Sequence, residues 1–452
     1  GLRTIVNEGW GSFWWKYKQY RASKKLARNS GIKALELDLI SGDLGVEVDL
    51  INKKVSVVIP TKNAGQDFEF TLKKIRDQKG LKETEIIVVD SGSTDETVKL
   101  AEDYGAEIYE IKPEDFNHGG TRNYGAGKAI GDYILFMVQD ALPIGDYWMY
   151  NLVNVLEGDA RIAAASCRQV PRSDADLFAC FLIDNHNKSL GFYGDRITGL
   201  TGDFNKLPLI EKRKLCGLDD VSTLVRKDIF DEFKFKEIQY AEDIDLGLRL
   251  LKGGHNLAFL HSVGVMHSHN RNAFYILKRY YVDNKILQKL FNYRGYYPKC
   301  SLDELLYSIL ILYSALNLSV VSIKEFLQHT SDSNGYRDAI IMLGGLIQGN
   351  FKVSDVQCNG DRSLDEFFHK IDEITKERKI NNKFMNILLS QYRNQLDNLK
   401  KFVVISNPNE EDFIDALYKL FSSVVASALS VKLLEYKDDR AYMVESLLGG
   451  GV

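Results

Sequence analysis

Short apolar runs that end abruptly in small polar residues dominate the first half of the chain. Residues 55 to 65 read VSVVIPTKNAG and residues 86 to 97 read IIVVDSGSTDET. A β-branched apolar run closed by turn-forming residues predicts a buried parallel strand that delivers a loop at its carboxyl end. Ligands of open α/β sheets bind at that end. The two loops therefore predict one nucleotide pocket, in which Thr61 and Asn63 face Asp90, an acceptor for a ribose or a base edge.

Helical segments alternate with these strands. Residues 68 to 80 and 95 to 105 predict helices that each stop at a glycine. A third strand is predicted over residues 133 to 141, with Asp140 at its carboxyl end. Alternating strands and helices predict parallel strands joined by right-handed crossovers. We therefore expect Asp90 and Asp140 to reach the same edge of the sheet.

The pattern changes to long helical periodicity from about Ser301 onward, where residues 407 to 413 (NPNEEDF) predict a helix start. This part of the sequence carries no strand signal, and it predicts an all-helical addition that serves packing or self-association. We therefore expect an N-terminal amphipathic arm over residues 1 to 52, an α/β domain over residues 53 to 298 and a helical domain over residues 299 to 452.

Three segments raise the question of membrane contact. Residues 10 to 20 place aromatic side chains at helical spacing among Lys and Arg, which predicts an amphipathic helix that docks on the main domain, on a membrane surface or on a preceding module. Residues 305 to 323 are uncharged, but Asn317 and several hydroxyls favour a buried or interfacial helix over a membrane span. Residues 274 to 299 interleave aromatic and basic side chains, which suits an anionic lipid surface, a dimer groove or a solvated helix face.

Composition narrows the class of protein. The 452 residues are 45% hydrophobic, which allows large cores, and a formal net charge of -4 argues against wholesale nucleic-acid binding. The five cysteines show no CxxC spacing and are odd in number, which favours a reducing compartment over a disulfide framework. No signal peptide is visible at the start of the chain. We therefore expect a cytoplasmic protein.

The first candidate for chemistry is the segment over residues 113 to 127, PEDFNHGGTRNYGAG. Glycines that permit close backbone approach, followed by Arg122 and Asn123 near a helix start, can cradle a diphosphate. The alternative is a Gly-Gly turn that only caps a helix. Its position between the predicted nucleotide strands and Asp140 favours the diphosphate.

Asp140 and a histidine pair are the candidates for metal binding. A divalent cation that bridges two phosphates needs only one or two protein carboxylates, although an aspartate in this position can also cap a turn. His267 and His269 stand at alternate positions of a short extended segment, where either imidazole could complete a metal shell.

Residues 240 to 254 (YAEDIDLGLRLLKGG) open a helix with three carboxylates, those of Glu242, Asp243 and Asp245. Acidic residues in a first turn ordinarily complement the helix dipole. Three within four residues exceed what capping needs, and a carboxylate near a sugar hydroxyl can act as a general base. We favour Asp243 for that role.

These motifs occur in one order, namely VVIPTKN, VVDSGSTDET, FNHGGTRN, QDA, CRQVPRSDA, AEDIDLGLRL and HSHN. In that order the chain resembles the inverting family 2 glycosyltransferases of GT-A fold over roughly residues 54 to 285. FNHGGTRN with QDA resembles the bacterial rhamnosyltransferase-like branch. The resemblance does not extend to the helical part.

The resemblance implies roles for individual residues. Asp243 would be the base and Glu242 a donor or acceptor contact, while Asp140 with His267 or His269 would bind the metal. The implied nucleotide-sugar contacts are Thr61, Asn63, Asp90, Ser91, His118, Gly119, Gly120, Arg122, Asn123 and Gln139. The family's DxD motif is not kept, because Gln139 and Ala141 flank Asp140.

The implied fold is an open mixed α/β sheet flanked by helices, with an all-helical C-terminal domain. The implied function is metal-dependent inverting transfer of L-rhamnose from a dTDP donor, with Mg²⁺ or Mn²⁺, onto a bacterial surface polysaccharide or a lipid-linked glycan. Expected partners are the donor, the glycan acceptor, a membrane surface at the inner face of the cell membrane, and a second copy or a neighbouring transferase module. The alternatives are another donor, such as a UDP-linked hexose or N-acetylhexosamine, and a non-catalytic scaffold.

Overall fold

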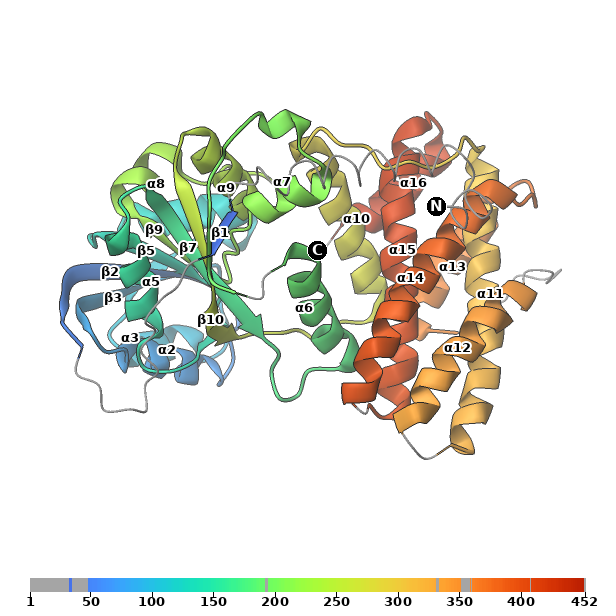
Figure 1. The fold of residues 1–452 in the computed structure, drawn as a ribbon, viewed down its shortest axis with the longest axis horizontal. Helices are drawn as coiled ribbons and strands as arrows, with labels where there is room; N and C mark the ends of the chain where they lie inside the picture. Colours follow the sequence, from blue (N-terminus) through green and yellow to red (C-terminus); the bar gives the residue numbers. More distant parts are fainter. Residues whose placement is uncertain are drawn as a thin grey trace. The chain divides into compact units, whose positions relative to one another are not determined.

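The computed structural model describes residues 32 to 34, 48 to 191, 194 to 330, 333 to 350, 358, 360 to 406 and 408 to 450. The aromatic helix expected near the start of the chain lies outside these residues. The chain forms two compact units (Figure 1). Of the described residues, the sheet unit comprises those up to 173 and from 186 to 268, and the helical unit comprises those from 174 to 185 and from 269 to 450.

A mixed β-sheet organises the sheet unit, with strand order β1-β8-β10-β7-β9-β5-β2-β3-β4 and with β6 paired to β10. The strands are β1 Ile32–Ala34, β2 Ile51–Thr61, β3 Leu81–Asp90, β4 Glu107–Glu110, β5 Tyr133–Met137, β6 Leu142–Pro143, β7 Ile162–Val170, β8 Arg196–Thr198, β9 Ser222–Arg226 and β10 Asn256–Met266. Strand β2 runs parallel to β3 and β5, and β3 runs parallel to β4. Strand β9 is antiparallel to both β5 and β7. The open mixed sheet that the sequence predicts is confirmed.

Helices cover both faces of this sheet. The helices and 3-10 turns of the segment between β2 and β10 are α2 Phe68–Arg76, α3 Thr97–Asp103, η1 Pro113–Asp115, α4 His118–Ala126, α5 Trp148–Gly158, α6 Leu177–Leu190, η2 Phe204–Lys206, α7 Leu209–Leu215, α8 Lys227–Phe233 and α9 Glu242–Lys252. Alternate residues of β2, among them Val57, join a core with Phe68 of α2 and Trp148 of α5. Val58 faces the other way, where a Cβ built on Gly125 of α4 would lie 2.6 Å from its Cγ1. A glycine is therefore needed for α4 to pack this closely on the sheet.

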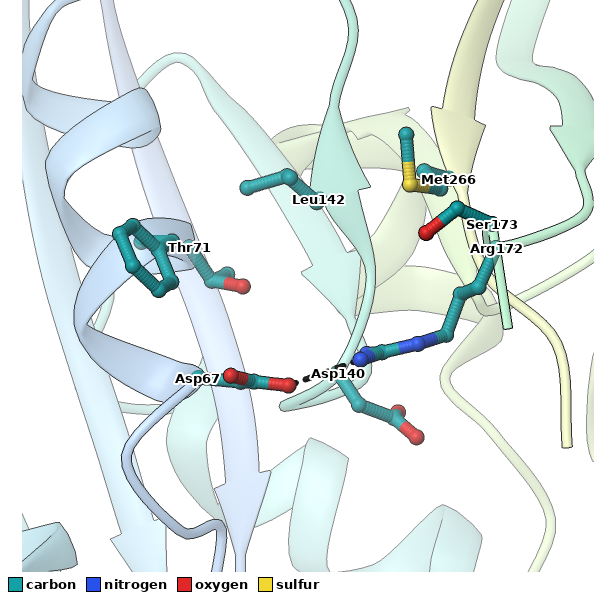
Figure 2. Close-up of a pocket in the computed structure, with 8 residues that line it drawn as sticks. Asp67, Thr71, Asp140, Leu142, Arg172, Ser173 and Met266 are labelled. Carbon is teal, nitrogen blue, oxygen red and sulfur yellow. Dashed lines mark hydrogen bonds and ion pairs between the residues drawn. The ribbon is translucent and has the colours of Figure 1, made fainter. Parts of the chain in front are cut away.

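The parallel strands bring the predicted polar tips together. Thr61 and Asp90 are register partners at the last positions of β2 and β3. Strand β5 ends at Met137, earlier than predicted, and Asp140 lies in the turn that follows. A small cavity of about 150 Å³ opens beside Asp140, between α2 and the ends of β7 and β10 (Figure 2).

From about Ser301 onward the described residues form helices, as the sequence predicts, and α10 Ala273–Leu290 precedes them in the same unit. These helices are α11 Leu302–Gln328, α12 Ser333–Gly349, α13 Arg362–Ile374, α14 Asn382–Ser406, α15 Glu410–Lys432, η4 Leu433–Glu435 and α16 Asp439–Gly449. The predicted helix start at residues 407 to 413 is confirmed, because Asn409 caps α15 by accepting a hydrogen bond from Asp412 N.

Within the described part of the chain, two helical stretches are long and apolar enough to cross a membrane by length and composition, namely α11 and Glu410–Glu435, which joins α15 and η4. Their most apolar windows are 83% and 89% buried inside the protein, which is the behaviour of core helices. The polar groups of α11 are also satisfied within the protein. Ser319 Oγ donates to Ala315 O over 2.6 Å, and Asn317 Oδ1 accepts from Tyr418 over 3.1 Å. The structure therefore matches the buried helix that we expected over residues 305 to 323.

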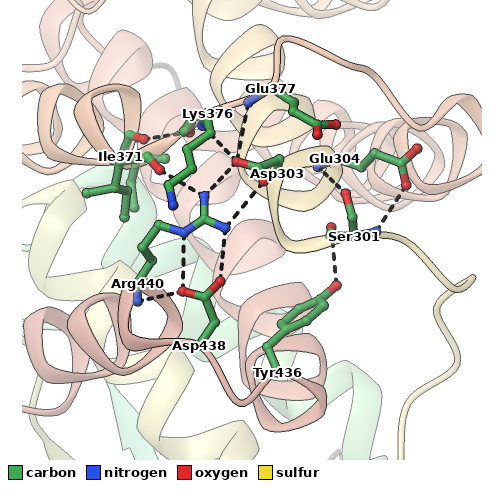
Figure 3. Close-up of polar contacts among 11 residues, drawn as sticks. Ser301, Asp303, Glu304, Ile371, Lys376, Glu377, Tyr436, Asp438 and Arg440 are labelled. Carbon is green, nitrogen blue, oxygen red and sulfur yellow. Dashed lines mark hydrogen bonds and ion pairs between the residues drawn. The ribbon is translucent and has the colours of Figure 1, made fainter.

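An arginine links α16 to the start of α11 within the helical unit (Figure 3). Arg440 of α16 forms ion pairs with Asp303 of α11 over 2.7 Å and with Asp438 over 2.9 Å. The same Asp303 Oδ1 accepts a hydrogen bond from Lys376 N over 2.7 Å, in the link between α13 and α14. The Asp303 side chain is only 13% exposed, so water replaces these bonds poorly.

We predict that Asp303→Ala lowers the free energy of unfolding of the protein by about 2 to 3 kcal/mol, because Arg440 loses one of its two carboxylate partners and the Lys376 amide loses its acceptor. Urea unfolding followed by circular dichroism measures this loss. The matched control is Glu366→Ala, which removes an 83%-exposed partner of an ion pair on α13 and should cost less than about 0.5 kcal/mol. Equal effects of the two substitutions would contradict this role of Asp303.

Candidate active site

The carboxylate of Asp90 organises the loop at the ends of β2 and β3. Its oxygens accept hydrogen bonds from Thr61 Oγ1 over 2.8 Å, from Gly92 N over 2.9 Å, and from Ser93 N and Oγ over 2.8 and 2.5 Å. A carboxylate has about four acceptor positions, and Asp90 is buried. The protein thus already engages Asp90, while its contact with a nucleoside stays a prediction.

Asn63 and Gln139 connect the neighbouring loops. Asn63 adopts a left-handed backbone with a φ of 46°, and its Oδ1 accepts from Thr94 N over 2.7 Å. Gln139, which follows β5, accepts from Lys62 N over 2.8 Å and donates to Lys62 O over 3.2 Å. Ser91 also contributes, since its Oγ donates to Thr61 O over 3.0 Å. Hydrogen bonds therefore connect the loops at the carboxyl ends of the three parallel strands β2, β3 and β5.

The HGGTRN segment forms the start of α4 and packs against residues 235 to 240. A Cβ on Gly119 would lie 2.4 Å from Lys236 O, and a Cβ on Gly120 would lie 3.3 Å from the Glu237 side chain. Asn123 Nδ2 donates to Phe235 O over 2.9 Å, and its Oδ1 accepts from Phe235 N over 3.0 Å. The close approach that the sequence predicts for the glycines is therefore made to the segment that leads into Glu242 and Asp243.

Arg122 is buried and holds two acidic residues. Its guanidinium lies 2.9 Å from Asp220 Oδ2 and 3.3 Å from Glu242 Oε1. The contact with Asp220 lacks hydrogen-bond geometry, and Arg122 Nε has no hydrogen-bond partner among the described residues. The imidazole of His118, in the same motif, packs edge-on against the ring of Phe116, and the two ring centroids are 5.0 Å apart. The positive charge of Arg122 is thus balanced by protein carboxylates, and its predicted contact with a diphosphate is untested.

Helix α9 begins at an unusual backbone position. Ala241 has a φ of 62°, in the left-handed region that costs a residue with a Cβ about 1 to 2 kcal/mol. This turn starts the helix at Glu242 and directs Asp243 toward Asp219 and Asp220, whose carboxylate oxygens lie within 4.8 Å of one another and of Asp243. Strain of this kind accumulates at functional sites because the surrounding structure must hold it.

Burial governs the protonation of this acidic cluster. Burial raises the pKa of Asp243, and the nearby carboxylates of Asp220 and Asp219 raise it further. Burial and the charges of Asp220 and Asp243 also raise the pKa of Glu242, against the opposing effect of Arg122. A carboxylate with a raised pKa is a stronger base than an exposed aspartate. Asp243 is therefore equipped to accept a proton from a neutral hydroxyl.

Asp245, the third carboxylate of the motif, has a structural role. It is buried and pairs with Lys236 over 3.0 Å and with Arg249 over 2.6 Å. Asp219 and Asp220 are functional candidates that our reading of the sequence did not include. The adjacent acidic residues in LCGLDD were their only signal, and such pairs are common on protein surfaces. Only the fold brings this pair to Asp243.

The predicted metal ligands form a second cluster. One ligand atom each from Asp140, His267 and His269 lies within 4.8 Å of the other two. His267 Nε2 is 3.5 Å from Asp140 Oδ1, and His267 is buried. Strand β10 ends at Met266, so both histidines follow the strand and do not belong to it. Two imidazoles and one carboxylate fit a divalent transition ion such as Mn²⁺ better than Mg²⁺, which prefers oxygen ligands.

A cavity lies on one side of this candidate metal cluster (Figure 2). Arg172 reaches across it to Asp67, the residue before α2, with an ion pair of 2.7 Å. The cavity is lined by Asp67, Phe70, Thr71, Asp140, Leu142, Arg172, Ser173 and Met266. Polar and apolar groups thus meet beside Asp140, although most of these residues were not singled out in the sequence.

We predict that Gly119→Ala destabilises the protein and displaces residues 235 to 240, because the new methyl group would overlap Lys236 O. Overpacking of this kind typically costs about 1 to 3 kcal/mol. The measurement is the midpoint of thermal unfolding. Gly158→Ala is the matched control, since a Cβ there would meet no atom within 4 Å. A wild-type midpoint for Gly119→Ala would show that this close approach is not required.

The sheet unit is similar in sequence to known proteins. The sequence profile of "Glycosyl transferase family 2" matches residues 56 to 232. The O-antigen chain rhamnosyltransferase RfbN of Salmonella typhimurium is 33% identical over 232 residues, which cover 50% of this chain and 70% of that protein. WbaN of Salmonella anatum, another O-antigen chain rhamnosyltransferase, is 27% identical over 233 residues, with the same two shares.

Solved structures with some likeness include the mannosyltransferase PcManGT from Pyrobaculum calidifontis in complex with GDP-Man and Mn²⁺. It has a TM-score of 0.44 and 14% identity, over 86% of this chain and 93% of that one. Residues 1–349 of S. aureus TarS give a TM-score of 0.40 and 15% identity, over 76% of this chain and 91% of that one. The identity and coverage of the sequence relatives show the family, and the chain belongs to glycosyltransferase family 2.

Proposed function

We propose that this glycosyltransferase moves L-rhamnose from a dTDP donor onto a hydroxyl group of a growing bacterial surface polysaccharide or lipid-linked glycan, with inversion at the anomeric carbon. The observation that carries the proposal is the cluster of the half-buried carboxylates of Asp243, Asp219 and Asp220 at the start of α9. The names of RfbN and WbaN support the choice of rhamnose and of a polysaccharide acceptor.

The reaction is a single displacement. Asp243 accepts the proton of the acceptor hydroxyl, whose oxygen attacks the anomeric carbon from the side opposite the nucleoside diphosphate. The bond between that carbon and the diphosphate oxygen breaks, and the diphosphate leaves with the bonding electron pair. Glu242, which Arg122 holds over 3.3 Å, is assigned a hydrogen-bond contact to the acceptor. Because one displacement occurs, the configuration of the sugar inverts.

We assign the donor to the edge at the ends of β2, β3 and β5. Thr61, Asn63, Asp90 and Ser91 shape the nucleoside pocket through the loop that they hold together. The HGGTRN segment and Gln139 border the path from this pocket to the acidic cluster. These assignments follow the family resemblance, and the connected hydrogen bonds at the strand ends support them.

The metal site in this proposal consists of Asp140, His267 and His269. A bound Mn²⁺ or Mg²⁺ supplies positive charge for the diphosphate of the donor and of the leaving group. The mixed nitrogen and oxygen ligands favour Mn²⁺. We place the enzyme at the cytoplasmic side of the cell membrane, where a lipid-linked acceptor resides, because residues 274 to 299 interleave aromatic and basic side chains.

We predict that the purified protein, given Mn²⁺, hydrolyses dTDP-rhamnose slowly and transfers rhamnose to a lipid-linked acceptor. Release of the nucleoside diphosphate from thymidine, uridine and guanosine donors measures the choice of nucleotide. Asp243→Asn should reduce transfer by about 100- to 10,000-fold, because it removes the general base, while donor affinity stays within a few-fold by calorimetry. The control is Asp228→Asn, an exposed carboxylate on α8.

Three outcomes would decide against parts of this proposal. Preference for a uridine or guanosine donor would reassign the sugar. Full transfer by Asp243→Asn would remove the base from its role. Absence of donor binding with either metal would favour a non-catalytic scaffold.

The raised pKa of Asp243 makes a prediction about pH. Protonated Asp243 cannot accept a proton, so activity should rise with pH through a pKa above that of an ordinary aspartate. Asp220→Asn removes a neighbouring negative charge that opposes ionisation of Asp243, and should move the acid limb of the kcat profile to lower pH. Asp228→Asn should leave that limb in place. An acid limb that moves to higher pH in Asp220→Asn would contradict this electrostatic role.

A further inference from the structure

We propose that Gln169, near the end of β7, is a positioning residue that sets the tautomer of His267 and directs the unprotonated Nε2 of that ring toward Asp140. This inference rests on the proposed function for its metal, whereas its tautomer can be observed without one. The family resemblance assigns no role to Gln169. This residue belongs neither to the acidic cluster around Asp243 nor to the cluster of candidate metal ligands.

The geometry joins the two clusters through one amide group. Gln169 Oε1 lies 2.9 Å from His267 Nδ1. Gln169 Nε2 forms a hydrogen bond to Asp219 Oδ2. His267 Nε2 faces Asp140 Oδ1 over 3.5 Å. Hydrogen bonds therefore connect His267 to Asp219 through Gln169, and the other face of the His267 ring looks onto the Asp140 carboxylate.

The direction of these hydrogen bonds follows from donor and acceptor chemistry. A carboxylate accepts hydrogen bonds, so the NH₂ group of the amide must face Asp219 and its carbonyl oxygen must face His267. That oxygen accepts only, so His267 must present an N–H at Nδ1. A neutral imidazole carries a single proton, which leaves the lone pair on Nε2. This is the tautomer that a metal ligand at Nε2 needs, and a partner on the other ring nitrogen is the usual way to select it.

The backbone holds both partners in place. Strands β7 and β10 are parallel neighbours in which Gln169 pairs with Val265 and Val170 pairs with Met266. His267 N then donates to Val170 O over 2.9 Å, just beyond the end of β10. The register of two central strands thus sets the distance between the amide and the imidazole, which is the support that a preorganised ligand requires.

The first test observes the tautomer directly. The protein with ¹⁵N-labelled histidine is studied by long-range ¹H–¹⁵N NMR without metal, at a pH where imidazoles are neutral, and the His267 signal is assigned by its loss in His267→Gln. We expect an Nδ1-protonated ring in the wild type. Gln169→Glu, which keeps an acceptor for Nδ1, should retain this tautomer, whereas Gln169→Met should lose it. An Nε2-protonated ring in the wild type would overturn the inference.

The second test measures metal binding without turnover. Titration with Mn²⁺ alone, followed by electron paramagnetic resonance, should show an affinity about 10- to 100-fold lower for Gln169→Met than for the wild type. The matched control is Ser166→Ala, on the same strand, which removes a buried hydrogen bond to Gly217 O without contacting His267 or Asp219. Unchanged Mn²⁺ affinity in Gln169→Met, or an equal loss in Ser166→Ala, would overturn the positioning role.

The two measurements also separate this inference from the proposed function. A wild-type protein that shows the expected tautomer and its loss in Gln169→Met, yet transfers no sugar, supports the role of Gln169 and rejects the proposed reaction. A protein that transfers rhamnose with His267 in the other tautomer rejects the role of Gln169 and keeps the reaction.

Discussion

The candidate active site depends on the ion pairs that the buried guanidinium of Arg122 forms with two carboxylates. The guanidinium lies between Asp220 and Glu242, which come from different parts of the chain. Removing these charges from water is costly, and their attraction offsets that cost only where each charge keeps its partner. Arg122 balances part of the negative charge, so that Asp243 can stand beside further carboxylates without the cluster being forced apart.

Helix α4, which carries Arg122, also positions the segment that leads to the proposed base. Gly119 and Asn123 of α4 fit against residues 235 to 240, and that segment leads into the left-handed turn at Ala241. A motif that resembles a phosphate cradle in sequence thus works in the structure as a support for the first turn of α9. Close packing and side-chain hydrogen bonds compensate for the strained backbone, which is how strain persists at functional sites.

In the helical unit, polar groups on apolar helices are buried and need hydrogen-bond partners within the protein. Hydroxyls of α11 return their hydrogen bonds to the preceding turn, as Ser319 does, and Asn317 finds the hydroxyl of Tyr418. Arg440 closes the unit through Asp303. Unpartnered polar groups would be costly in such an interior, and these contacts explain how helices of membrane-like composition serve as a protein core.

The sequence by itself determined the parallel strands, the helical second half and the family, because hydrophobic period and ordered motifs are local properties that survive without coordinates. It also marked Asp140, His267 and Asp243. Only the tertiary structure decided what surrounds them. Asp219 and Gln169 carry no distinctive local pattern, and they matter because strand order and register bring them to groups far along the chain. The burial and the neighbouring carboxylates that raise the pKa of Asp243 depend on that same long-range packing.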